Sequence, residues 1–105
     1  SDPELYATEE NVTYDKVALE SLPLDKIRAV DPALEEELRE GAFAKAKTSS
    51  GYVCAHCGEV FSNRQFLHVD HIVPLNKGGR SVRDNLQILC RSCNAKKGDQ
   101  LEGEY

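Results

Sequence analysis

Four cysteines occur as two pairs, and two residues separate the members of each pair. The pairs are Cys54 with Cys57 and Cys90 with Cys93. A tight turn with this spacing can direct two thiolates at one ion, and four thiolates at about 2.3 Å form a tetrahedral set that suits Zn²⁺. His56 could replace one thiolate, although four cysteines already complete the site. Two disulfides or a redox pair are the alternatives, but paired spacing without secretory features favours zinc.

The residues between and after the two pairs predict two strands and a helix. An alternating, β-rich run begins near Phe66, and residues 86–89 form a short second strand. Gly78 and Gly79 require a loop between the strands. Residues 91–97 form a helix that Gly98 ends. An ion on the cysteines would therefore fix how the helix lies on the strand pair.

This order of motifs resembles the HNH nucleases, whose core is the ββα-metal fold. The resemblance covers residues 54–97 and rests on Val-Asp-His-Ile-Val-Pro-Leu (69–75), the two glycines at 78–79, Asn-Leu-Gln-Ile-Leu-Cys (85–90) and Cys-Asn-Ala-Lys-Lys (93–97). It implies an α+β fold, with an HNH core over residues 51–105. Residues 1–50 are then an acidic, helical N-terminal extension packed on that core.

The resemblance also implies which residues act on a phosphodiester bond. His71 would be the general base, a task that suits an ordinary pKa near 6.5. Asp70 and Asn94 would hold one catalytic divalent ion, with Asn94 standing where other members carry histidine. Their hard oxygen ligands suit Mg²⁺, or another cation such as Mn²⁺ or Ni²⁺, while the structural ion is Zn²⁺. Asn85 would brace the loop that holds His71.

Adjacent residues of a regular strand point to opposite faces, so Asp70 and His71 cannot both enter one site from such a strand. The strand must therefore end, bulge or turn at this point, and Pro74 makes an ending plausible. His68 shares the face of Asp70 and is a possible accessory residue of the site. Its alternative is a partly exposed strand residue.

The charges are distributed unevenly along the chain. Residues 1–50 carry six basic and twelve acidic side chains, whereas residues 51–98 carry seven basic and three acidic ones. A basic segment is typical of nucleic-acid binding, although a solvated mixed surface is the alternative. The candidate phosphate-binding residues are Arg80, Arg83, Arg91 and Lys97, with Lys77 nearby.

The N-terminal half is predicted to be mainly helical. Residues 1–12 are expected to be a loosely ordered lead-in, followed by helical spacing over residues 14–22 and a short helix from residue 23 or 24 to 29. Asp31 and Pro32 begin a clearer helix over residues 31–40, with an apolar stripe that includes Phe43. Gly41 interrupts or ends it, and residues 45–51 form a link. The glutamates at 35–37 form a solvated face.

Length and composition indicate one small domain. The chain has 105 residues, and its small apolar core needs additional stabilisation. Zinc binding can contribute on the order of 10 kcal/mol to the free energy of folding. It lacks an apolar run long enough for a membrane span and begins unlike a signal peptide. We therefore expect a cytoplasmic protein without membrane contact, or a delivered protein with an inhibitor or immunity partner if this is a toxin domain.

Three functions remain possible from the sequence. The first is a metal-dependent endonuclease that cuts DNA, most simply duplex DNA. The second is a zinc-stapled module that binds nucleic acid without cutting it. The third is a zinc domain that binds a partner protein through its acidic half.

Overall fold

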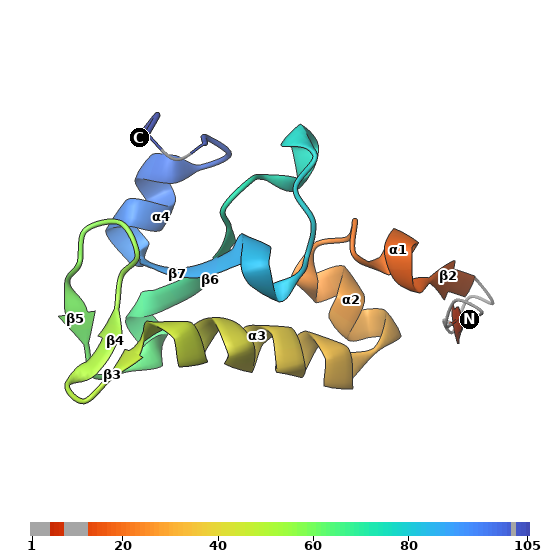
Figure 1. Cartoon of the computed structure of the whole chain (residues 1–105), viewed down its shortest axis with the longest axis horizontal. Helices are drawn as coiled ribbons and strands as arrows, with labels where there is room; N and C mark the ends of the chain where they lie inside the picture. Colours follow the sequence, from red (N-terminus) through yellow and green to blue (C-terminus); the bar gives the residue numbers. More distant parts are fainter. Residues whose placement is uncertain (1–4, 8–12, 102) are drawn as a thin grey trace.

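The computed structural model describes residues 5–7, 13–101 and 103–105 (Figure 1). The elements follow in this order: β1 (Leu5–Ala7), β2 (Thr13–Asp15), α1 (Lys16–Leu19), α2 (Leu24–Val30), α3 (Pro32–Ala46), β3 (Lys47–Thr48), β4 (Gly51–Val53), β5 (Val60–Phe61), β6 (Leu67–His71), β7 (Leu86–Cys90) and α4 (Arg91–Lys97). Short 3-10 turns lie among them: η1 (Arg64–Phe66), η2 (Leu75–Lys77) and η3 (Arg83–Asn85). No helix in the described ranges is long and apolar enough to cross a membrane.

The segment before α2 differs from the sequence prediction. Residues 1–4 and 8–12 of the expected lead-in lie outside the described residues, and β1 pairs antiparallel with β2. The helix expected over 14–22 is limited to α1, because β2 takes its first residues and a turn follows Leu19. Pro23 then precedes α2, as expected.

Helix α3 begins as its sequence predicts and is longer than expected. The Asp31 side chain accepts a hydrogen bond from Leu34 N at 3.1 Å, which caps the helix. The helix continues through Gly41, so this glycine neither ends nor breaks it. Beyond Gly41 the helix buries Ala42 and Phe43 completely. Packing of this last part outweighs the helix-weakening effect of one glycine.

The prediction that residues 35–37 form a solvated face is wrong for Glu35. Glu36 and Glu37 are exposed, but Glu35 is 5% exposed and pairs with Arg28 of α2 at 3.4 Å. Because α2 folds back along α3, a cation seven residues earlier in the chain comes within reach of this carboxylate.

The segment predicted as a link, residues 45–51, instead completes α3 and forms a hairpin. Thr48 lies opposite Gly51, and β4 pairs with β5 on its other side. The Thr48 hydroxyl donates to Gly51 O at 2.9 Å and accepts from Ser50 N at 3.2 Å. Serine and threonine in this segment therefore form the turn of a hairpin.

The strand pair β6–β7 and helix α4 occur where the sequence predicts them. The strands are antiparallel, with Asp70 opposite Gln87. Figure 1 shows α3 along one side of this pair and α4 leaving its other side. Phe43 of α3 joins Leu86 and Leu89 of β7 in one buried cluster. The core therefore lies between α3 and the strand pair, and α3 supports the strand that leads into α4.

Candidate functional site

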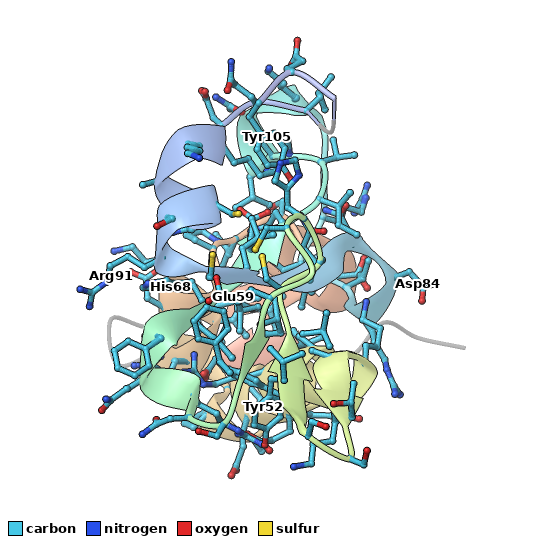
Figure 2. All side chains as sticks on the ribbon, turned by 90° about the vertical axis from the view of Figure 1, so that its left-hand side faces the viewer. Tyr52, Glu59, His68, Asp84, Arg91 and Tyr105 are labelled. Atoms are coloured by element: carbon cyan, nitrogen blue, oxygen red, sulfur yellow. The ribbon has the colours of Figure 1, made fainter. Side chains whose placement is uncertain are left out.

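The four cysteines meet at one point of the fold. Cys54 follows β4, Cys57 lies in the turn after it, Cys90 ends β7, and Cys93 is in the first turn of α4. Their sulfur atoms lie within 4.8 Å of one another and are free thiols, so the disulfide alternative does not apply. Figure 2 shows the sulfurs gathered between α4 and the loop that carries Glu59.

The distances within the cluster fit a tetrahedral zinc site. Four thiolates at about 2.3 Å from one ion would have their sulfurs about 3.8 Å apart. The Sγ atoms of Cys57 and Cys90 are 4.0 Å apart. This donor set and spacing match a structural metal centre. His56 is exposed on the turn, and its ring stacks on Tyr105 with centroids 4.2 Å apart.

Backbone groups around the sulfurs favour negative charge on one of them. Burial raises the pKa of the Cys54 thiol, but N–H groups of Cys57, Cys90 and His56 outweigh this effect and lower it to about 6. The bond from Cys90 N to Cys54 Sγ is 3.3 Å. Burial and the neighbouring sulfurs raise the pKa of Cys93 to about 12. A bound cation would relieve this crowding of thiolates.

Asp70 and His71 border the same open pocket, although they are neighbours on β6. The strand ends at His71, as the geometry of the two side chains requires. The pocket has a volume of about 330 Å³, and its lining is formed by Pro23, Asp70, His71, Pro74, Leu75, Asn76, Lys97, Gly98 and Asp99. Asp70 and His71 therefore line one solvent-accessible space.

A buried lysine contacts both Asp70 and His71. Lys97, in the last turn of α4, is 1% exposed. Its ammonium lies 3.1 Å from Oδ2 of Asp70 and donates to the carbonyl of His71 at 2.8 Å. Gln87 Nε2 donates to the same Oδ2 at 3.0 Å. The expectation that Lys97 lies at the surface to bind phosphate is therefore wrong, because its charge is used inside the fold.

His71 is held through its Nε2 atom. This nitrogen lies 2.7 Å from the hydroxyl oxygen of Ser81. Burial lowers the pKa of His71 below its ordinary value of 6.5, Asp70 partly opposes this change, and Lys97 adds to it. The imidazole is consequently neutral near pH 7, which is the form that can accept a proton.

Asn85 braces the loop between the two strands, as expected. Its Oδ1 accepts from Val73 N at 2.9 Å, and its Nδ2 donates to the carbonyls of Val73 and Arg80 at 3.0 and 2.9 Å. The loop also needs Gly79, because a Cβ atom there would lie 1.8 Å from Val73 O. The two ends of the loop are thus tied together directly after His71.

Asn94 and His68 are not part of the pocket lining. Asn94 is half-buried and lies one turn before Lys97, on the same side of α4. His68 is exposed and lies opposite Leu89 in the strand pair. Figure 2 shows His68 near Arg91, with Asp84 on the opposite side of the molecule.

The other candidate phosphate-binding residues, Arg80, Arg83 and Arg91, are exposed. Arg80 pairs with Glu20 at 3.6 Å, and Arg83 packs its side chain against Gly41 of α3. Arg91 is exposed at the start of α4. Lys77 pairs with Glu104 at 3.6 Å. These cations come from the loop between β6 and β7 and from the start of α4.

Three features of the site were not predicted from the sequence. They are the hydrogen bond between Ser81 and His71, the hydrogen bond from Gln87 to Asp70, and the burial of Lys97. The strand register, once known, would have identified Gln87, because it lies opposite Asp70. Burial of Lys97 depends on how α4 packs against β6, which the spacing of residues along the helix does not specify. Ser81 has no comparable signal in the sequence.

Comparisons with known proteins match the segment that carries most of these residues. Residues 54–100 match the family model of the HNH endonuclease. The chain is also 43% identical over 49 residues to a CRISPR-associated endonuclease Cas9 from Corynebacterium diphtheriae. The match covers 44% of this chain and only 4% of that protein. Residues 54–100 therefore match the HNH endonuclease family. The order of β6, β7 and α4 and the four clustered cysteines are consistent with its ββα-metal fold.

Proposed function

We propose that this domain is a metal-dependent endonuclease that hydrolyses phosphodiester bonds of DNA. The observation that carries the proposal is the shared pocket of Asp70 and His71 at the end of β6. A candidate metal ligand and a candidate base thereby line the same open pocket.

His71 acts as the general base in this proposal. Its lowered pKa keeps the ring neutral near pH 7, so that it can take a proton from the attacking water. The backbone of His71 is held by Lys97, and the loop after it is held by Asn85. A base fixed in this way needs little reorganisation before proton transfer.

Asp70 and Asn94 would hold the catalytic cation. Both donors that reach the Asp70 carboxylate bind Oδ2, so Oδ1 is the oxygen on which a cation fits. The amide oxygen of Asn94 is a hard, neutral ligand, and such oxygens favour Mg²⁺ or Mn²⁺ over softer ions. A divalent cation there would neutralise charge that develops on the phosphate and stabilise the leaving oxygen.

Duplex DNA is the proposed substrate, and Zn²⁺ the proposed ion of the cysteine cluster. Arg83 lies just before β7 and Arg91 just after it, and exposed cations of this kind hold phosphates without reading sequence. Zinc on the cysteines would join β4, β7 and α4, and thereby fix the helix that carries Asn94 and Lys97.

The test is cleavage of a supercoiled plasmid by the full chain with zinc bound and with Mg²⁺, Mn²⁺ or Ni²⁺ added. We expect metal-dependent nicking that His71→Ala reduces by roughly 10²–10⁴-fold, the usual contribution of a general base. Asp70→Asn should also lose activity. Asp25→Asn is the matched control, because Asp25 is an exposed carboxylate of α2 outside the pocket.

Two results would contradict the proposal. One is nicking by His71→Ala at the rate of the unaltered protein. The other is tight DNA binding without cleavage under any of the three metals, which would favour a nucleic-acid-binding module.

A further inference from the structure

A hydrogen-bond chain connects His71 to a backbone carbonyl far outside the HNH match. His71 Nε2 lies 2.7 Å from Ser81 Oγ, and the Ser81 hydroxyl donates to Leu22 O at 2.5 Å. Leu22 lies in the turn between α1 and α2, 59 residues before Ser81. Residues of the N-terminal extension therefore reach the candidate base through one side chain.

The direction of this chain follows from the number of available protons. A carbonyl oxygen can only accept, so the single hydroxyl proton of Ser81 must point at Leu22 O. Ser81 Oγ then presents only lone pairs to His71 Nε2. A hydrogen bond between them requires that Nε2 carry the imidazole proton, which leaves Nδ1 of the neutral ring unprotonated.

The turn that supplies the carbonyl is itself fixed against the loop. Ser81 N donates to Glu20 O at 2.6 Å, and Arg80 pairs with the Glu20 carboxylate at 3.6 Å. Ser81 is 2% exposed, so water does not compete for its hydroxyl. Leu19 and Ile27, on either side of the turn, are buried and anchor it to the fold.

We propose that Ser81 is a positioning residue that uses the carbonyl of Leu22 to fix the tautomer of His71, so that Nδ1 is the atom that takes the proton from water. This inference rests on the proposed function for its catalytic meaning, but the tautomer itself does not depend on cleavage. The extension before the HNH segment is then part of the catalytic apparatus, because it supplies the acceptor that orients the base.

The direct test is the protonation of the His71 ring nitrogens, measured by long-range ¹H–¹⁵N NMR on the full chain with zinc bound, near pH 7.5. The chain has three histidines, and the His71 signals are assigned by their loss in His71→Gln. We expect the Nε2–H form to dominate. A dominant Nδ1–H form would overturn the proposal. Because the measurement is made on the unaltered protein, it does not depend on whether a Ser81 variant folds.

Activity provides the second test. Ser81→Ala should lower kcat for DNA nicking about tenfold or more, yet less than the roughly 10²–10⁴-fold expected for loss of the base itself, and should leave KM unchanged. The same variant should give a mixture of the two His71 tautomers. Ser81→Thr keeps the hydroxyl and should restore both kcat and the Nε2–H tautomer. Ser21→Ala is the matched control, since Ser21 lies in the same turn and its exposed hydroxyl donates to Ala18 O of α1 at 2.6 Å.

The outcomes separate the two proposals. Failure of the unaltered chain to cut DNA refutes the proposed function, while the NMR result still decides the tautomer. Unchanged kcat and an unchanged tautomer in a folded Ser81→Ala protein would refute the positioning role.

Discussion

Replacement of Lys97 by methionine should destabilise the protein strongly, because it leaves the Asp70 carboxylate without its cation. The two side chains are 1% and 10% exposed, and the ammonium also donates to the carbonyl of His71. Removal of one partner of a buried ion pair costs about 3–5 kcal/mol. Asp70 keeps its bond from Gln87 and borders an open pocket, so we expect the lower end, about 3 kcal/mol.

The assay is urea unfolding of the zinc-loaded protein. Lys96→Met is the matched control, because Lys96 is the exposed neighbour on α4 and should change the free energy of unfolding by less than about 0.5 kcal/mol. The double variant Lys97→Met, Asp70→Asn should cost less than the sum of the single ones, with a coupling of about 0.5–3 kcal/mol. Mg²⁺ should stabilise Lys97→Met more than the unaltered chain, because the cation then meets an unpaired carboxylate.

The reasoning would be refuted if Lys97→Met and Lys96→Met had the same small effect, or if the two substitutions of the double variant were simply additive. Either result would mean that the contact between Lys97 and Asp70 contributes nothing to the folded state.

Three further predictions concern the metal cluster, the loop and the base. Cys54→Ser, or removal of zinc by a chelator, should unfold the region around α4 and lower the melting temperature sharply. Calorimetry combined with metal analysis measures this effect, and a melting curve unchanged by chelation would contradict it. Asn85→Ala should lower the free energy of unfolding by about 1–3 kcal/mol, because partly buried backbone groups of the loop lose their partners. Asn63→Ala, at an exposed turn, should have a smaller effect in the same urea assay. The pKa of His71, measured by NMR, should lie below 6.5 because burial disfavours the charged imidazole. The unfolded chain then binds the proton more readily, so the free energy of unfolding should fall as the pH falls below 6.5. A pKa above 6.5 would contradict the partly buried environment of this ring.

Local sequence signals predicted several helix ends, the cysteine cluster and the end of one strand. Gly98 ends α4, and Asp31 caps α3, because capping depends on residues within one turn. The paired cysteines predicted their cluster because ligand spacing is itself a local property. The end of β6 at His71 followed from the requirement that neighbouring side chains share one site.

Contacts between distant segments could not be predicted in this way. Glu35 is buried because Arg28 returns to it from another helix, and Lys97 is buried because α4 crosses Asp70. The bond between Ser81 and Leu22 joins segments 59 residues apart. Such contacts depend on how helices and strands pack, which neither periodicity nor capping specifies.

The proposed function requires a divalent cation held by Asp70 and Asn94 next to His71, and mapping with Mn²⁺ tests this requirement most directly. Substoichiometric Mn²⁺ added to the zinc-loaded chain broadens the NMR signals of residues near the bound ion. We predict selective broadening at Asp70, His71 and Asn94 that Asp70→Asn abolishes. Broadening centred elsewhere, or none at these residues, would contradict the account.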